Sequence, residues 1–377
     1  MSMEIRTMVR LKLEKWVNGG FTIAHWEGKP VFVVGGIPGE VVMATFSKIL
    51  SSHAFARVDT VLEASEKRIA QDCSIFLGCG GCCYRHIPYS EEILIKKQLL
   101  GDLLRVDQQS IAVFSGNPEF YRNTVQWKLK NGERGFFEKF SNEWIGLPVT
   151  KDFPKGECRT VRKEILSSNL EAKNVRISEY SQDLIGVIDY DIEIAKLEVA
   201  GRFIEITPKG FLQINSGLLE IWMNSIRSAL TTENIVLELF SGSGCISVGV
   251  ADAVQYLYGL EVEKRSVKFA KQNASKNGFR NLEFAALDLF RNSFWKTLKR
   301  NFDVVIANPP RTGLGKIVVA DLLQMLPEKI VYSSCNSITL KRDLNSLLHF
   351  YSLESTSLFD FFPRTEHYEV LVVLSRK

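Results

Sequence analysis

The sequence predicts an α/β protein in which a doubly wound parallel sheet follows a small β domain. From about residue 206, apolar strand candidates alternate with helical stretches, as they do in doubly wound folds. Residues 1–62 instead carry short segments rich in Val, Phe and Thr, in which apolar and polar residues alternate. The chain has 377 residues, 45% of them hydrophobic, which is enough for two or three domains with substantial cores.

The N-terminal strand candidates are MVRLKLEKW, PVFVVGG, EVVMATFSKIL and FARVDTVLEAS, and turns such as NGG and GIPGE separate them. Strands at this spacing predict a small, OB-like β-barrel over residues 1–62. Such a barrel is either an RNA-binding module or a small β module of another kind.

Residues 63–200 are predicted to form a central α/β domain. A cysteine-rich stretch opens it, and SEEILIKKQLLGDLLRV follows with apolar residues at helical spacing. The strand candidates are TVQWKLK, ERGFFEKF and LIGVIDYDIEIAKLEVA, with a polar helical piece near 161–174. The pattern does not fix the topology of this region.

Residues 201–377 are predicted to form the domain that contains the doubly wound sheet. The helix candidate SGLLEIWMNSIRSAL precedes the apolar run NIVLELF and a glycine turn. The further buried-strand candidates are YLYGLEV, FDVVIANPP, KIVYSS and YEVLVVL, with helices between several of them.

Composition limits the compartment and the partners. The sequence contains no run of about 18 apolar residues, and its N-terminal stretch lacks the marks of a signal peptide, so we expect a cytoplasmic protein without a membrane partner. A net charge of +4 permits an RNA or DNA partner without requiring one. In the cytoplasm, clustered thiols bind metals or act in catalysis more often than they form disulfides.

The stretch LELFSGSGCIS, residues 237–247, is an apolar strand that leads into a G-x-G turn and then a helix. Glycines at such a turn let the backbone approach a ligand closely. Glu261 ends the next strand candidate, where a carboxylate can accept hydrogen bonds from ribose hydroxyls. These features fit S-adenosylmethionine as well as NAD, and a lone Glu at this place can also be a solvated strand end.

The stretch NPPR, residues 308–311, follows the strand candidate FDVVIA. Two prolines stiffen a turn at the carboxyl edge of the sheet, where open α/β folds bind their ligands. An Asn-Pro-Pro turn after a buried strand is typical of nucleobase methyltransferases. Together with the glycine turn and Glu261, Asn308 favours an S-adenosylmethionine enzyme over a dehydrogenase.

Cys335 directly follows the strand candidate KIVYS and precedes a helix that Asn336 or Ser337 can cap. A thiol at a helix N-terminus is expected to have a lowered pKa and to be a better nucleophile. The alternative is a buried structural cysteine. The position at a carboxyl strand edge favours the functional role.

A thiol nucleophile has a clear use in methylating C5 of a pyrimidine. Thiolate addition to C6 gives C5 carbanion character, so that C5 can attack a methyl sulfonium. A base must then remove the C5 proton so that the thiol can leave. The stretch FPRTEHYEVLVVL offers Glu366, His367 and Glu369, and Glu369 is the best base candidate because it opens an apolar strand.

Several motifs in order resemble the RNA uracil-C5 methyltransferases, the bacterial 23S rRNA and tRNA 5-methyluridine enzymes. They are LELFSGSG, NPPR, SSCNSITLKRDL and FPRTEHYEVLVVL, together with FLQIN at 211–215. The stretch CSIFLGCGGCCYRH, residues 73–86, holds four of the chain's seven cysteines and is similar to the family's cluster motif. The resemblance covers nearly the whole chain.

The resemblance implies a [4Fe–4S] cluster and a TRAM domain. Its cluster ligands would be Cys73, Cys79, Cys82 and, at a distance, Cys158. Cys83 would then be an extra thiol beside a ligand, and a zinc site is the alternative. The barrel at 1–62 resembles the TRAM domain of some members, and the cluster would have a structural or RNA-positioning role.

The resemblance also implies a role for each matching residue. Cys335 would be the nucleophile and Glu369 the base. Arg122 and Phe211 would hold the target uracil, with a surface Arg and a core Phe as the ordinary alternatives. The S-adenosylmethionine site would comprise Gln213, Phe240, Gly242, Glu261, Asp288 and Asn308.

The chain departs from the family pattern at three places. Asn308 stands where Asp is usual, Phe240-Ser241-Gly242 replaces Tyr-Cys-Gly, and Cys245 replaces Asn or Thr. None of these changes removes the nucleophile or the base, so we expect an active enzyme.

The resemblance implies an RNA substrate, and a structured loop is the expected target because flipping costs least for an unpaired nucleotide. A 23S rRNA uridine is the first choice and a tRNA uridine the second, and the enzyme is expected to act as a monomer. The rival interpretations are an RNA N-methyltransferase, which needs no thiol, and a non-catalytic iron–sulfur RNA-binding protein.

Overall fold

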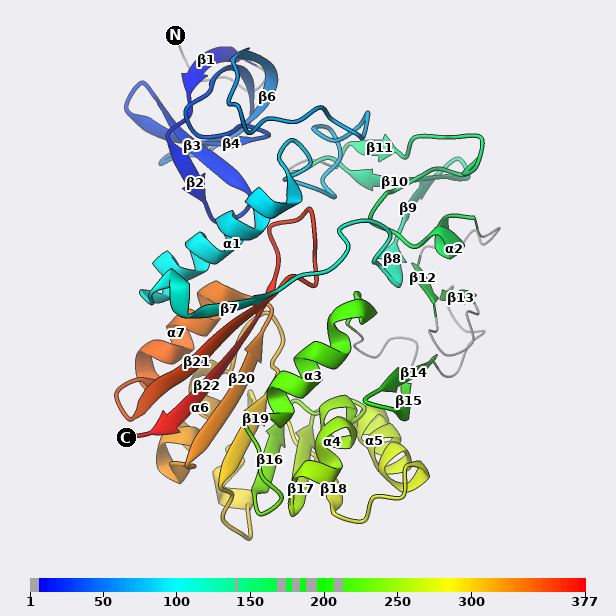
Figure 1. Cartoon of the computed structure of the whole chain (residues 1–377), viewed down its shortest axis with the longest axis vertical. Helices are drawn as coiled ribbons and strands as arrows, with labels where there is room; N and C mark the ends of the chain where they lie inside the picture. The colour runs from blue at the N-terminus through cyan, green and yellow to red at the C-terminus, as the bar shows by residue number, and fades with distance from the viewer. Residues whose placement is uncertain (1–6, 140–141, 168–173, 178–183, 188–194, 207–212) are drawn as a thin grey trace. The chain divides into compact units, whose positions relative to one another are not determined.

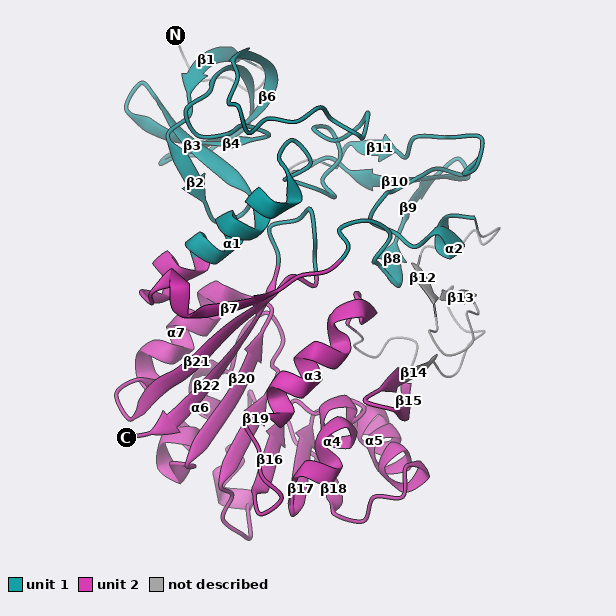
Figure 2. Cartoon of the chain, in the orientation of Figure 1, with its two compact units in different colours: residues 1–99, 117–173, 362–367 teal, residues 100–116, 174–361, 368–377 magenta. Residues whose placement is uncertain are grey.

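The structure is a computed structural model that describes residues 7–139, 142–167, 174–177, 184–187, 195–206 and 213–377. The chain divides into two compact units, coloured separately in Figure 2. Unit 1 comprises residues 1–99, 117–173 and 362–367, and unit 2 comprises residues 100–116, 174–361 and 368–377. None of the described helices is long and apolar enough to cross a bilayer.

Unit 1 begins with a six-stranded, mainly antiparallel sheet of strand order β1-β5-β6-β4-β3-β2 (Figure 1). Its strands are β1 Met8–Lys12, β2 Lys15–Val17, β3 Phe21–Trp26, β4 Lys29–Val34, β5 Val41–Ile49 and β6 Ala54–Glu63. One face of this sheet buries small and branched apolar residues, because inward and outward side chains alternate along each strand. The β-rich N-terminal region expected from the sequence is therefore present.

The rest of unit 1 contains short elements around the cysteine-rich stretch. Helix α1, Tyr89–Leu104, starts in unit 1 and continues into unit 2, close to the helix expected at 90–106. The other elements of unit 1 are β8 Thr124–Gln126, β9 Lys128–Lys130, β10 Glu133–Phe137, β11 Trp144–Gly146 and α2 Lys163–Leu166. The helical piece expected near 161–174 is confirmed only as α2, since residues 168–173 lie outside the described part of the chain.

Unit 2 is built on an eight-stranded sheet of order β18-β17-β16-β19-β20-β22-β21-β7. Its strands are β7 Ile111–Phe114, β16 Ile235–Leu239, β17 Tyr256–Glu261, β18 Leu282–Ala286, β19 Val304–Ala307, β20 Lys329–Ser334, β21 Tyr351–Phe359 and β22 Glu369–Arg376. All neighbouring strands pair in parallel except β22, which runs antiparallel to both β20 and β21. The predicted sheet is confirmed, with one reversed strand in its interior.

Helices cover both faces of this sheet, as a doubly wound fold requires. In Figure 1, α3, α4 and α5 lie on one face and α6 and α7 on the other. Their bounds are α3 Leu219–Arg227, α4 Cys245–Val250, α5 Lys264–Lys276, α6 Gly315–Met325 and α7 Ser337–Leu347. Unit 2 also contains β12 Asn174–Ile177, β13 Leu184–Val187, β14 Ala195–Val199 and β15 Arg202–Ile206.

Strand β7 joins the sheet from a distant part of the sequence. It pairs with β21 at the edge, with Ile111 opposite Thr356, although it lies within the segment predicted as the central domain. Buried Ile, Leu, Val and aromatic side chains from these strands and from α6 and α7 form the core. This core fixes the carboxyl ends of the parallel strands, where the predicted site residues lie.

Candidate active site

The glycine turn connects β16 to α4 with left-handed backbone at three places. Phe240, Gly242 and Gly244 have φ angles of 62°, 53° and 78°. A Cβ on Gly244 would lie 3.1 Å from the Ala270 Cβ, so glycine lets the turn pack against α5. A Cβ on Gly242 would meet no protein atom within 4 Å, which leaves open space beside the turn.

Glu261 ends β17 and is bonded to this turn. One carboxylate oxygen accepts a hydrogen bond from the Gly242 N–H at 3.0 Å, and the other accepts from the Glu263 N–H at 2.9 Å. These bonds fix the carboxylate beside the glycine turn and leave further lone pairs for ligand hydroxyls. The expected acidic strand end is therefore present.

The NPPR turn follows β19 and is held by the start of α7. Asn336 caps α7 by accepting from the Ile338 N–H, as predicted, and its amide also donates to the Arg311 carbonyl at 2.9 Å. Asp343, farther along α7, accepts hydrogen bonds from the Leu314 N–H at 2.8 Å and the Tyr332 hydroxyl at 2.9 Å. The helix therefore stabilises the turn that carries Asn308.

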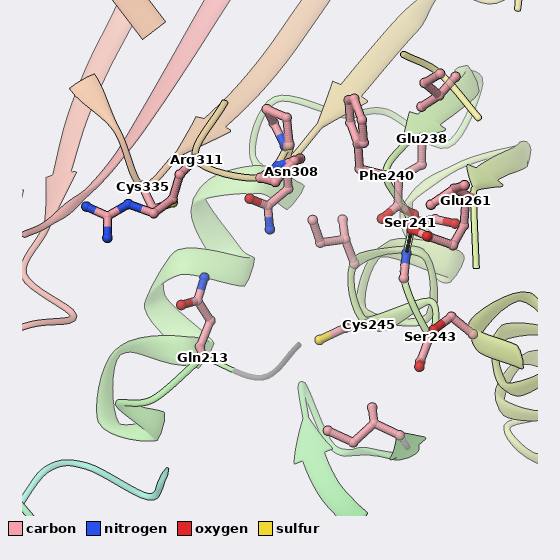
Figure 3. Close-up of a pocket in the computed structure, with 18 of the residues that line it drawn as sticks. Gln213, Glu238, Phe240, Ser241, Ser243, Cys245, Glu261, Asn308, Arg311 and Cys335 are labelled. Carbon is pink, nitrogen blue, oxygen red and sulfur yellow. Dashed lines mark hydrogen bonds between the residues drawn. The ribbon is translucent and has the colours of Figure 1, made fainter. Parts of the chain in front are cut away.

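A cavity of about 480 Å³ opens at this edge of the sheet. Its volume lies in the range of cofactor sites, and its walls are mostly apolar. The lining includes the predicted residues Gln213, Phe240, Gly242, Glu261, Asp288, Asn308, Cys335 and Glu369. Figure 3 shows Gln213, Asn308, Arg311 and Cys335 on different elements from Glu238, Phe240 and Glu261 around this space.

One polar group in the cavity wall is available to a ligand. The buried hydroxyl of Ser241 has no hydrogen-bond partner among the described residues. Buried hydroxyls in folded proteins are usually hydrogen-bonded, so an unpaired one in a cavity wall fits a ligand with polar atoms. Together with the open space at Gly242, this suits an adenosyl cofactor.

Cys335 and Glu369 meet because β22 is antiparallel. Ser334 at the end of β20 pairs with Val370 in β22, so the first residue of β22 lies at the carboxyl end of β20. Both side chains line the cavity, and the Glu369 charge acts on the Cys335 thiol. The structure thus brings the predicted nucleophile and the predicted base together.

The pKa of Cys335 differs from the expectation. Burial, followed by the charge of Glu369, raises the pKa of this thiol to about 11, and Arg311 lowers it only in part. The expected lowering at a helix N-terminus is wrong for the structure without substrate. Desolvation of the thiolate outweighs the favourable helix end.

Glu369 is fully buried and held by one hydroxyl. The Ser333 hydroxyl donates to the Glu369 Oε1 at 2.6 Å, and the Trp222 indole N–H donates to the Ser333 oxygen at 3.0 Å. Burial raises the pKa of Glu369 to about 7, and the hydrogen bond from Ser333 opposes that rise. A carboxyl group with a pKa near neutrality can both take up and release a proton.

The four predicted cluster cysteines lie in unit 1 and influence one another. Cys158 raises the pKa of each of Cys73, Cys79 and Cys82, although burial is the largest cause for all three. All seven cysteines are free thiols. Within the described ranges, no three His, Cys, Asp or Glu side chains stand close enough together to hold a single metal ion.

Cys83 makes different contacts. Its thiol is buried and donates to the Glu366 carboxylate, with 3.6 Å between Sγ and Oε2. Burial and the charge of Glu366 raise the pKa of Cys83, and the groups that act on it include no other cysteine. Cys83 therefore interacts with different charged groups from its neighbour Cys82, on which Cys158 and Cys79 act.

Of the two predicted uracil-binding residues, Arg122 is not among the described residues that line the cavity. Arg122 belongs to unit 1, where its guanidinium donates to the Tyr121 hydroxyl at 3.3 Å and lies near Cys158 and Cys82. Phe211 lies outside the described residues. Both assignments therefore remain predictions.

Several residues in and around the cavity were not predicted. Ser333, Trp222 and Glu238 give no signal in the sequence, because a buried Ser, Trp or Glu is recognised only from its neighbours. Glu238 is buried in β16, and burial raises the pKa of its carboxyl to about 8. Asp343 lies inside the motif SSCNSITLKRDL, where its position on the buried face of an amphipathic helix could have indicated a buried partner.

Comparison with known proteins identifies the family. Residues 159–377 match the family described as tRNA (Uracil-5-)-methyltransferase. An uncharacterized RNA methyltransferase of Leptospira interrogans is 34% identical, with 98% of this chain and 95% of that protein covered. The 23S rRNA (uracil(1939)-C(5))-methyltransferase RlmD of a Marinomonas species is 27% identical, with 94% and 92% covered.

The fold has a solved counterpart. The Pyrococcus abyssi tRNA (uracil-54, C5)-methyltransferase, solved with S-adenosyl-L-homocysteine, superposes with a TM-score of 0.75 at 19% identity, with 97% of this chain and 99% of that chain covered. The likeness confirms the α/β methyltransferase fold with a β-rich N-terminal region. The chain therefore belongs to the RNA uracil-C5 methyltransferases, which methylate uridine at C5 with S-adenosylmethionine as the methyl donor.

Proposed function

We propose that this protein methylates C5 of a uridine in 23S rRNA through a covalent bond between Cys335 and C6. The observation that carries the proposal is the shared cavity, because the thiol, a buried carboxyl group and the glycine turn all line it. The cofactor would lie along Phe240, Gly242, Glu261 and Asp288, and Gln213 and Asn308 would also contact it.

The reaction divides between two side chains. The Cys335 thiolate forms a bond to C6, and the electron pair of the C5–C6 double bond makes C5 a nucleophile that takes the methyl group. The Glu369 carboxylate then removes the C5 proton. The electron pair of that C–H bond restores the double bond, and the C6–S bond breaks with its pair returning to sulfur.

Two RNA classes are candidates. The 27% identical Marinomonas enzyme carries a 23S rRNA name, which supports rRNA as the first choice. The matching family and the P. abyssi enzyme are both named for tRNA, which makes a tRNA uridine the second candidate. In both cases we infer a monomer that acts in the cytoplasm.

The N-terminal sheet supplies a surface suited to single-stranded RNA, in keeping with a TRAM-like, OB-like barrel at 1–62. On the face opposite its core, Phe32 pairs with Phe55, and their rings stack with centroids 5.4 Å apart. The His53 ring lies against both, and exposed Lys48 pairs with Phe55 on the next strand. Half-buried aromatic rings beside a cation suit stacked bases and a phosphate.

Cys73, Cys79, Cys82 and Cys158 would hold a [4Fe–4S] cluster in the central segment, residues 63–200. Four mutually influencing thiols form the right donor set, because each thiolate binds its own iron. A zinc ion needs all four sulfur atoms about 2.3 Å from one point, and the described side chains do not gather so closely. The cluster would shape the RNA-binding part of the protein, and Arg122 beside it would contact the uracil or its phosphate, with Phe211 as its partner.

Mass spectrometry of digested RNA tests the substrate. We compare 5-methyluridine in 23S rRNA and tRNA from cells with and without the gene. Loss from rRNA supports the first candidate, and loss from tRNA alone supports the second. An unchanged 5-methyluridine content in both RNAs would refute the function.

Replacing the nucleophile tests the chemistry. Cys335→Ala should abolish both methyl transfer and the denaturant-stable RNA–protein adduct, because the proposed bond to C6 forms through the Cys335 sulfur. Cys245→Ala, which removes another thiol from the same cavity wall, should still form the adduct. An N-methyltransferase would keep working without Cys335, and a non-catalytic RNA-binding protein would show no heat of S-adenosylmethionine binding.

A further inference from the structure

A buried hydrogen-bond chain reaches Glu369 from helix α3. The Trp222 indole N–H donates to the Ser333 oxygen at 3.0 Å, and the Ser333 hydroxyl donates to the Glu369 Oε1 at 2.6 Å. All three residues are at most 2% exposed. The hydroxyl therefore acts as an acceptor toward tryptophan and a donor toward glutamate.

The members of the chain are themselves held in place. Ser333 lies in the interior of β20, where it pairs with Leu371 of the neighbouring strand β22. The Trp222 ring packs edge-on against Phe361, with 6.3 Å between the ring centroids and 86° between the planes. An indole locked in this way presents its N–H in one direction, so Ser333 has one preferred hydroxyl orientation.

The other polar groups near Glu369 do not replace this contact. Cys335 follows β20 and interacts with Glu369 through charge, and Arg311 in the NPPR turn acts on Cys335. On β21, Phe359 lies opposite Glu369, and buried Asp360 follows it with its backbone N–H bonded to the Phe114 carbonyl. The only side-chain hydrogen bond to the Glu369 carboxylate among the described residues comes from Ser333.

We propose that Ser333, oriented by Trp222, is a positioning residue that holds the Glu369 carboxylate in the ionised form and orientation needed to remove the C5 proton. The inference rests on the proposed function, because it assigns Ser333 and Trp222 to its last step. A donor to a carboxylate stabilises the charged form, and a donor that is itself fixed by its neighbours also fixes the orientation of the carboxylate.

Loss of the hydrogen bond from Ser333 should affect one step of the reaction, the removal of the C5 proton. Bond formation at C6 and methyl transfer precede removal of the C5 proton, so neither step uses Glu369 as the base toward C5. In the methylated adduct, C5 carries both the new methyl group and a proton. The carboxylate takes that proton, the C–H electron pair forms the double bond, and sulfur leaves with the pair of the C6–S bond. A smaller ionised fraction of the carboxylate, or a carboxylate that is wrongly oriented, therefore leaves the methylated adduct uncleaved.

The test compares Ser333→Ala with the wild-type enzyme in single-turnover reactions on a uridine-containing RNA. We expect S333A to transfer the methyl group into the adduct at a near-normal rate and to release product about tenfold more slowly at neutral pH. The pKa that limits product release on the acid side of its pH profile should rise by about one unit, because the Glu369 carboxylate loses the hydrogen bond from Ser333. S-adenosylhomocysteine affinity should stay unchanged.

Three further variants separate positioning from general damage. Ser333→Thr restores the hydroxyl and should return the acid limb toward the wild-type position. Trp222→Phe keeps the aromatic ring but removes the N–H, and should shift the limb in the same direction by a smaller amount. Thr356→Val removes another buried hydroxyl from the same sheet, opposite Val372, and should leave the limb in place.

Each result decides the inference. An S333A enzyme with a wild-type acid limb and no adduct accumulation overturns it. If S333A does not fold, W222F carries the test, and an unshifted limb in W222F overturns the inference. Failure of the proposed function looks different, because the wild-type enzyme itself would then form no adduct.

Discussion

At the scale of single residues, burial disfavours the charged forms of the two proposed catalytic groups, Cys335 and Glu369. Burial raises the pKa of Cys335 to about 11 and that of Glu369 to about 7, so both acids are mostly or partly protonated near neutral pH. The carboxyl group is poised at the pH where it must accept a proton and then release it.

Glu369→Gln should trap the methylated adduct. The amide has nearly the same shape but cannot take the C5 proton, so product release should fall by about 10²–10⁴-fold while adduct formation persists. Gel electrophoresis under denaturing conditions with labelled RNA measures both quantities. Glu366→Gln, three residues earlier in the chain, is the matched control and should turn over normally; a variant at 369 that releases product normally would contradict the assignment.

Some single residues were predictable and others were not. Cys335, Glu369 and the cap Asn336 stand beside strand and helix ends that the sequence pattern indicates. The pKa of Cys335 was not predictable, because the local pattern shows the helix end but not the burial that outweighs it. Ser333 and Trp222 become meaningful only when α3, β20 and β22 are packed together.

At the scale of elements, the turn between β16 and α4 depends on the close approach of α5. Gly244 has φ +78°, and a Cβ there would lie 3.1 Å from the Ala270 Cβ and 3.3 Å from its Cα. Glycine is therefore needed both for the backbone conformation and for the packing of two helices against the turn.

Gly244→Ala should destabilise unit 2 by about 1–3 kcal/mol and weaken S-adenosylhomocysteine binding, because the turn must move. Gly278→Ala is the matched control, since Gly278 has nearly the same φ of +77° but open space around its Cβ position. Thermal unfolding and calorimetry measure the two effects. Equal losses in both variants would show that backbone strain alone, rather than contact with α5, is responsible.

The contact between β16 and α4 gives a pH dependence of stability. Burial raises the pKa of Glu238 from 4.5 to about 8, even though Ser247 donates a hydrogen bond to it. The folded protein thus holds a proton that the unfolded chain releases above pH 4.5. The stability from this group is fully present below about pH 4.5 and is lost as the pH rises through about 8.

Glu238→Gln should remove that part of the pH dependence, because an amide does not ionise. Between about pH 5 and pH 9, the melting temperature of the wild-type protein should fall relative to that of the variant. Thermal unfolding followed by circular dichroism at a series of pH values checks this. Parallel curves for the two proteins would mean that Glu238 ionises normally in the folded state.

At the scale of the whole molecule, the two units divide the predicted sites. All the described residues that line the cavity belong to unit 2, whereas the four predicted cluster ligands belong to unit 1. We therefore expect that the two predicted sites can be damaged separately.

If the proposed [4Fe–4S] cluster is present, Cys158→Ala should abolish the visible absorption and the bound iron of the purified protein, because the cluster would lose its distant ligand. Unit 1 should unfold at a lower temperature, while S-adenosylhomocysteine binding stays within about twofold of wild type. Iron analysis, calorimetry and limited proteolysis measure the three quantities. Iron retained in full by the variant would contradict the proposed ligand set.

The sequence predicts the sheet of unit 2 better than its connections. The strands β16, β17, β19, β20 and β22 all follow from apolar runs flanked by helices. The pairing of β7 with β21 was not predictable, because it joins segments more than two hundred residues apart that carry no matching local signal. The division into two units was not predictable either, because each unit is assembled from several separate chain segments.

The register of the reversed strand β22 sets which of its side chains lies beside Cys335. The pairing of β22 with β20 places Val370 opposite Ser334, so that Glu369, one residue earlier, lies next to Cys335, one residue later. Sliding the ladder by one residue would turn the carboxyl group to the opposite face of the sheet. Correct folding and the proposed chemistry therefore depend on the same strand register. A protein with a shifted register would not place Glu369 beside Cys335 and would be inactive on RNA.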